Sequence, residues 1–130
     1  MTLTNIIRFE LILVLLICVS CDKEINYNEK YYSKEIQNKL GGEMEFRVEG
    51  GRVDLLTEDR AYEIEWASNW KEAIGQALWY GLQSNKKPGI ILIMKSKKDY
   101  KYYLQLNSAL NYASLASNFE VLVYPNDFEL

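Results

Sequence analysis

The sequence predicts a single α/β domain in which helices flank a mixed sheet, with the element order α-β-β-β-α-β-α-β. Residues 43–49 alternate apolar and charged side chains and lead into Gly50–Gly51, a pattern typical of a half-buried strand before a tight hairpin. Residues 69–84 carry apolar side chains at helical spacing. Residues 90–94 form a continuous apolar run, as expected of a strand that is covered on both faces.

The same periodicities predict the remaining elements. A helix is expected over 29–40, where apolar side chains recur every four residues and Gly41–Gly42 ends the pattern. Further strands are expected at 52–57, 61–66 and 119–124, and a further helix over about 98–117. The hairpin start and the β-α-β ending together imply antiparallel and parallel pairs in one sheet. Gly75, in the helix over 69–84, is expected to let that helix pack closely against the sheet.

Composition limits the chemistry that the chain can perform. The 130 residues are 48% apolar and have room for one packed domain. The absence of histidine excludes serine–histidine triads, cysteine–histidine dyads and histidine-rich zinc sites. The two cysteines, Cys18 and Cys21, lie at the end of an apolar run without a second pair that could complete a zinc site.

Charge is distributed unevenly along the chain. The net charge of −3 argues against a generally basic nucleic-acid binder. Residues 43–65, however, hold eight acidic side chains and three arginines, whereas residues 86–101 hold six lysines and one aspartate. This pattern fits an acidic metal site beside a basic surface for a phosphate backbone, or two ordinary solvated faces.

The N-terminus has the pattern of a signal peptide. The apolar run at 11–20 would rise only about 15 Å as a helix, too little to span a bilayer. The tripeptide Val19–Ser20–Cys21 resembles a bacterial lipobox, whose cysteine is lipidated. The predicted division is a lipoprotein-type signal peptide over 1–20, a tether over 21–28 that begins at a lipidated Cys21, and the folded domain over 29–130.

Two alternatives for the N-terminus stay open. The apolar run could remain uncleaved as a plain anchor, or the start codon could be misassigned on a cytoplasmic protein. The lipoprotein interpretation places the protein in the bacterial cell envelope with a lipid in the membrane. A misassigned start codon would instead place it in the cytoplasm.

Three carboxylates mark the candidate site. Asp54 lies in the run GGRVDLLT, and Glu63 and Glu65 lie in YEIEWA, so all three fall on short apolar strands. Glu63 and Glu65 are two residues apart and share one face of their strand. Carboxylates beside apolar side chains need a cationic partner, and a divalent metal is the simplest one. Alternatively, Asp54 pairs with Arg52 or Arg60 at the surface.

The element order and these motifs resemble the PD-(D/E)XK nuclease superfamily, which has the restriction endonuclease-like fold. The run from Gly42 to Met94, including NWKEAIGQALWYGLQ and KKPGIILI, is similar to a family of small bacterial and phage proteins assigned to that superfamily. The resemblance implies Mg²⁺- or Mn²⁺-dependent hydrolysis of nucleic acid, with DNA favoured over RNA. It also implies that Asp54, Glu63 and Glu65 hold the metal and that Gln76 assists, with sequence specificity low or supplied by a homodimer.

The chain departs from the superfamily at position 65, where the family usually has lysine. Related proteins carry a lysine at the position of Asn69 instead, so neither position supplies the cation here. Lys71 is the remaining candidate for the catalytic cation, although it lies about 140° from Gln76 around the helix. Glu45 and Glu35 are further candidates for an acidic ligand. The alternative interpretation is a degenerate, non-catalytic lipoprotein that acts as an interaction or structural module.

Overall fold

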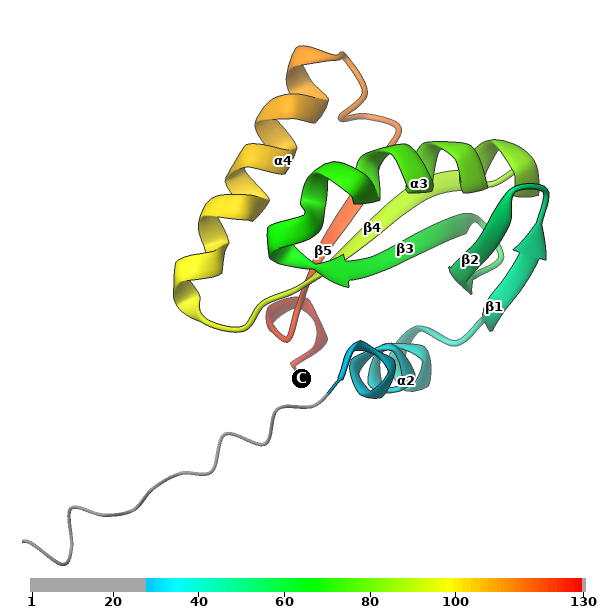
Figure 1. Cartoon of the computed structure of the whole chain (residues 1–130), viewed down its shortest axis with the longest axis horizontal. Helices are drawn as coiled ribbons and strands as arrows, with labels where there is room; N and C mark the ends of the chain where they lie inside the picture. Colours follow the sequence, from blue (N-terminus) through cyan, green and yellow to red (C-terminus); the bar gives the residue numbers. More distant parts are fainter. Residues whose placement is uncertain (1–27, 130) are drawn as a thin grey trace, which may run out of the picture.

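The computed structural model describes residues 28–129, and its elements follow the predicted order (Figure 1). The helices and strands are α2 (Glu29–Leu40), β1 (Glu43–Val48), β2 (Gly51–Leu56), β3 (Arg60–Trp66), α3 (Trp70–Ser84), β4 (Lys87–Ile93), α4 (Tyr100–Tyr112) and β5 (Glu120–Tyr124), with short 3₁₀ turns η1 (Ala67–Asn69), η2 (Lys97–Asp99) and η3 (Asn126–Phe128). The predicted signal peptide over 1–20, the lipidated Cys21 and all but the last residue of the predicted tether over 21–28 lie outside the described residues. Within those residues, no helix is long and apolar enough to cross a membrane.

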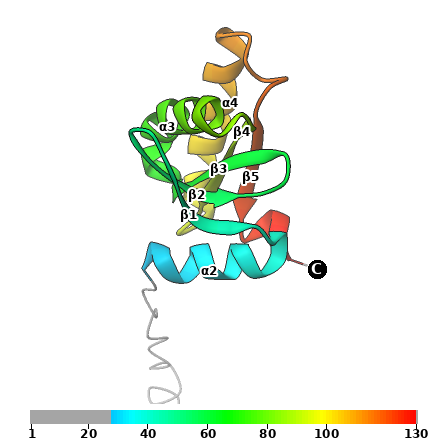
Figure 2. The same ribbon diagram turned by 90° about the vertical axis from the view of Figure 1, so that its right-hand side faces the viewer.

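The five strands form one mixed sheet in the order β1-β2-β3-β4-β5. The first three strands pair antiparallel, and β3, β4 and β5 pair parallel. Helices α3 and α4 cover one face of the sheet and α2 covers the other (Figures 1 and 2). The predicted α/β class, a mixed sheet flanked by helices, is therefore confirmed.

Strand β4 shows why the sheet has two cores. Ile90 and Leu92 pack with α3 and α4, whereas Ile91 and Ile93 pack on the opposite face with Ile36 of α2. Successive side chains of a strand point to opposite faces, so a continuous apolar run fits only a strand covered on both sides. All four side chains are almost fully buried, as the apolar run predicted.

Local contacts set the helix boundaries. The side chain of Asn28 caps α2 by accepting the N–H of Tyr31 at 3.0 Å. The helix predicted over about 98–117 begins two residues later, at Tyr100 after the η2 turn, and its predicted end is wrong because α4 stops at Tyr112. Ser114 has φ 58°, a left-handed conformation that a right-handed helix cannot continue through.

The close approach of α3 to the sheet does not occur at Gly75, so that prediction is wrong. A Cβ built on Gly75 meets no atom within 4 Å. The close approach lies at Gly81, whose added Cβ would be 3.1 Å from the carbonyl oxygen of Lys86. On strand β4, an added Cβ at Gly89 would be 2.4 Å from the ring of Tyr62, its partner on β3. The hydroxyl of Tyr62 donates to the carboxylate of Glu120, which holds the ring in place.

These contacts predict opposite effects for two glycine-to-alanine substitutions. Gly89→Ala should lower the free energy of unfolding by about 1–3 kcal/mol, because the new methyl group overlaps the Tyr62 ring. Gly75→Ala, the control, should raise it by about 0.5–1 kcal/mol, because alanine favours an exposed helix position. Urea unfolding followed by circular dichroism measures both changes. A neutral Gly89→Ala variant would show that Tyr62 can move aside freely.

Candidate functional site

The candidate site lies where strands β2 and β3 separate. Their register pairs Leu55 with Tyr62 and Leu56 with Ala61. Beyond these pairs, Oδ2 of Asp54 accepts the N–H of Ile64 at 2.9 Å. A carboxylate is thereby fixed in the fork between the two strands.

Strand β3 separates apolar and acidic side chains by its alternation. Tyr62, Ile64 and Trp66 belong to or pack against the core cluster that faces α2. Glu63 and Glu65 project to the other face of the strand. Glu63 is only 5% exposed, which is rare for a glutamate that has no cationic partner.

Five carboxylates lie close enough at this fork for their charges to act on one another. We call this group, which consists of Glu29, Glu45, Asp54, Glu63 and Glu65, the carboxylate fork. The pKa of Glu63 is raised to about 9, most strongly by burial and then by the nearby charges of Asp54, Glu65, Glu29 and Glu45, in that order. The pKa of Asp54 is raised to about 6, mainly by burial, although the hydrogen bond from the Ile64 N–H opposes the shift. The pKa of Glu29 is raised to about 7 by burial and then by the charges of Glu65 and Asp54. At neutral pH the cluster therefore retains protons on groups that would be ionised in water.

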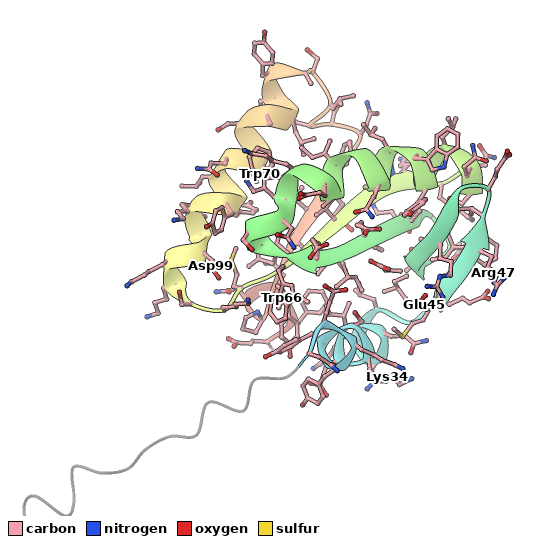
Figure 3. The ribbon with its side chains drawn as sticks, in the orientation of Figure 1. Lys34, Glu45, Arg47, Trp66, Trp70 and Asp99 are labelled. Carbon is pink, nitrogen blue, oxygen red and sulfur yellow. The ribbon has the colours of Figure 1, made fainter. Side chains whose placement is uncertain are left out.

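Two members of this cluster come from outside strands β2 and β3. Glu29, which the sequence interpretation missed, stands in the first turn of α2 and looks in the sequence like an ordinary acidic residue at a helix start. Glu45 comes from β1, where Figure 3 shows it on the side of the hairpin near α2. Glu35, the other upstream candidate, is exposed and lies near Tyr124 instead. The pKa of Tyr124 is raised most strongly by burial and then by the charge of Glu35.

The positions where a lysine was considered do not place a cation among the carboxylates. Asn69 donates from Nδ2 to Oε1 of Glu65 at 3.0 Å, and the same oxygen accepts the N–H of Trp66 at 2.8 Å. The Nζ of Lys71 lies 5.7 Å from the ring centroid of Trp70, and its side chain is exposed. Position 69, where the nuclease resemblance implied a lysine, thus holds a neutral amide that contacts Glu65.

The arginines considered as surface partners of Asp54 pair elsewhere. Arg52 forms an ion pair with Glu45 at 3.1 Å, and Arg60 forms ion pairs with Glu120 at 3.4 Å and Asp59 at 3.9 Å. Within residues 28–129, no lysine or arginine forms an ion pair with Asp54, Glu63 or Glu65.

Two buried oxygens at the site lack hydrogen-bond partners. They are Oε2 of Glu63 and Oε1 of Gln76, a half-buried residue of α3. A buried acceptor without a donor costs about 1–3 kcal/mol. A proton or a cation at Glu63 would relieve part of this cost.

The three predicted metal ligands are neighbours but do not form a ready-made metal centre. In the part of the chain that the structure describes, no group of three or more ligating side chains is arranged to hold a metal ion. The hydrogen bonds explain this, because Asp54 and Glu65 each direct one oxygen at a backbone N–H.

Comparisons with known proteins place the chain near viral proteins. Putative KilA-N domain-containing protein L32 of Acanthamoeba polyphaga mimivirus is 47% identical over 68 residues, which cover 52% of this chain and 18% of that protein. Protein L33 of the same description and virus is 39% identical, with 44% of this chain and 30% of L33 covered. Protein R878 is 40% identical over 62 residues, with 48% and 17% covered. The chain therefore spans less than a third of each relative. No family model and no solved structure matches it.

These relatives overturn the resemblance to the bacterial and phage PD-(D/E)XK nucleases. The similar proteins are viral and are named for a KilA-N domain, not for a nuclease. The prediction of a metal-dependent nuclease, and its alternative of a degenerate nuclease-fold lipoprotein, are wrong. The physical reason is that three acids on two short strands are too few to specify a reaction, and the expected lysine is absent from positions 65 and 69.

The raised pKa of Glu63 predicts how stability changes with pH. The folded protein holds the Glu63 proton up to about pH 9, whereas the unfolded chain releases it near the ordinary value of 4.5. Stability from this group is therefore present below about pH 4.5 and is lost as the pH rises toward 9. In EDTA at pH 8, Glu63→Gln should be more stable than wild type by at least about 1.4 kcal/mol, the value of one pKa unit.

Urea unfolding between pH 5 and 9 measures this effect, with the exposed Glu72→Gln in α3 as the matched control. Glu63→Gln should flatten the decline in stability with pH, and Glu72→Gln should leave it as in wild type. An unchanged slope in Glu63→Gln would mean that Glu63 ionises in the folded protein as it does in water.

Proposed function

We propose that this domain binds nucleic acid, with DNA favoured over RNA. The observation that carries the proposal is the similarity of about half the chain to three KilA-N domain-containing proteins. KilA-N domains are generally nucleic-acid-binding domains. Because the chain spans less than a third of each relative, the proposal concerns binding by this domain and not the activity of those whole proteins.

The distribution of lysines supports the proposal. Lys95, Lys97, Lys98 and Lys101 are all exposed and lie between the end of β4 and the first turn of α4. We call residues 95–101 the basic segment. Exposed lysines gain affinity for a phosphate backbone by releasing counterions, so the basic segment is the surface that best fits DNA. The ionised carboxylates of the fork would repel a phosphate backbone.

We also propose that the domain has the restriction endonuclease-like arrangement of helices and strands. The element order and the β1-β2-β3-β4-β5 sheet support it, without implying hydrolysis. A homodimer remains a prediction. The predicted location, the cell envelope through Cys21 or the cytoplasm if the start is misassigned, also remains a prediction, because residues 1–27 lie outside the described part.

We also propose that Mg²⁺ or Mn²⁺ binds at the fork when the carboxylates are ionised, with Asp54, Glu63 and Glu65 as ligands. The unpartnered Oε2 of Glu63 supports this proposal, and so do the burial and the mutual repulsion that together raise the pKa values of Glu63 and Asp54. A bound cation would supply positive charge that offsets the carboxylates beside the DNA-binding surface.

Fluorescence anisotropy with labelled DNA tests the binding proposal. The full chain should bind DNA, and affinity should fall steeply with salt. Replacing both Lys98 and Lys101 by glutamine should weaken binding and reduce the slope of log K against log salt by up to about 0.9 for each phosphate that is no longer neutralised. Lys39→Gln, at the exposed end of α2, is the matched control and should bind as wild type does. Absence of binding to any DNA or RNA would refute the proposal.

Thermal unfolding tests the cation proposal independently of DNA. At alkaline pH, millimolar MgCl₂ or MnCl₂ should raise the unfolding temperature relative to EDTA. At a metal concentration of a hundred times Kd, the corresponding gain in the free energy of unfolding is about 2.7 kcal/mol. Asp54→Asn should lose most of this response, because one charged ligand is removed. Glu72→Gln should retain it. A wild-type protein that shows no metal-dependent shift would leave protons as the only means of neutralising the cluster.

A further inference from the structure

A hollow of about 760 Å³ lies at the carboxyl ends of the parallel strands β4 and β5, apart from the carboxylate fork. Residues 94–97 and Tyr100 line it on the side of β4 and α4, and residues 125, 126 and 129 line it on the side of β5. In open α/β sheets, ligands bind in crevices outside the carboxyl ends of the strands. This volume is in the range of sites that hold small molecules or single nucleotides.

The cationic wall of the hollow comes from an ordered loop. The backbone N–H of Lys95 donates to Oδ2 of Asp99 at 2.8 Å, and the N–H of Lys98 donates to Oγ of Ser96 at 3.2 Å. The Nζ of Lys95 lies 4.5 Å from the ring centroid of Trp66, a cation–π contact that orients this exposed lysine. Figure 3 shows Trp66 at the end of β3, between α2 and the segment that carries Asp99.

The aromatic wall of the hollow is Tyr100, the first residue of α4. Its ring stacks on Tyr103 with centroids 5.2 Å apart and an interplanar angle of 29°, yet the residue remains 53% exposed. Tyr103 therefore supports the ring on one side, and the exposed part can stack on a flat ligand. Met94 and Pro125 add apolar surface, and Asn126 adds a side-chain amide that can donate and accept hydrogen bonds.

The charges of the lining favour an anionic ligand, and the exposed ring of Tyr100 favours one that carries a flat ring. Lys95 and Lys97 outnumber the single carboxylate of the lining, Glu129, so the hollow favours a negatively charged group. A phosphate fits the lysines, and a nucleobase fits the exposed face of Tyr100. A base in a duplex has both faces covered by its neighbours, whereas a base in a single strand can leave the stack.

We propose that this hollow binds one nucleotide of a single-stranded nucleic acid, with the phosphate at Lys95 and Lys97 and the base stacked on Tyr100. The inference rests on the proposed nucleic-acid binding and specifies its substrate class. It predicts that the domain binds a single strand more tightly than a duplex of the same sequence.

Anisotropy titrations of the full chain with a labelled oligothymidylate and with a labelled duplex test the proposal. Tyr100→Ala should weaken single-strand binding about five- to hundredfold, as expected for the loss of one stacked base, and should affect duplex binding much less. Tyr100→Phe should restore single-strand binding, because it keeps the ring. Tyr112→Ala is the matched control, since Tyr112 lies on the same helix, is 95% exposed and does not line the hollow. Circular dichroism verifies that each variant is folded.

The outcomes separate this inference from the function on which it rests. Loss in Tyr100→Ala, rescue in Tyr100→Phe and no change in Tyr112→Ala would support it. Binding of both DNA forms that is indifferent to Tyr100 would overturn the inference and leave nucleic-acid binding standing. Displacement of the oligonucleotide by an equal concentration of thymidine monophosphate would assign the hollow to a free nucleotide and overturn the single-strand proposal. Failure to bind any nucleic acid would refute both.

Discussion

Strand β3 must bury apolar side chains toward α2 while it carries two glutamates on its other face, and the rest of the domain is arranged around this constraint. It pairs antiparallel with β2 and parallel with β4, so it joins the hairpin part of the sheet to the β-α-β part. Tyr62, Ile64 and Trp66 fasten it to one core. Because side chains alternate along a strand, this fastening leaves Glu63 and Glu65 no other orientation. The carboxylate fork is therefore a consequence of how the core is built.

The carboxylate fork carries an energetic cost that the core has to offset. Glu63 is buried with an unpartnered oxygen, and its neighbours are acids. A buried charge without a partner is resolved either by taking up a proton or by binding a cation. Hydrophobic packing on both faces of β4 supplies stability that can offset this cost. A cluster of buried acids that lowers the stability of the fold is typical of a binding site, where stability is lost in favour of function.

Local patterns predicted the elements well, whereas contacts between distant segments were not predictable. The helix over 29–40 and the apolar strand at 90–94 follow from periodicity within a few residues. Glu29 joins the fork only because α2 folds back under the sheet, which no local pattern indicates. Similarly, the hollow joins residues 94–100 to residues 125–129, which become neighbours only when β4 and β5 pair. The resemblance to nucleases was wrong because element order and short motifs do not specify an activity, and the similar proteins are viral and named for a KilA-N domain.

Trp66 lies between the acidic and basic parts of the molecule. Its backbone N–H donates to Glu65, and its ring makes a cation–π contact with the ammonium group of Lys95. Its ring also forms a T-shaped pair with Tyr32 of α2, with the centroids 5.5 Å apart. A nucleic acid held on the basic segment would thus lie close to the carboxylate fork. The repulsion between that nucleic acid and the fork depends on how many of the carboxylates are ionised, because the Coulomb energy is proportional to the charge. Protons already held at neutral pH by the raised pKa of Glu63 reduce that repulsion, and a bound divalent cation would reduce it further. The same burial that destabilises the fork therefore makes its surroundings more compatible with a phosphate backbone.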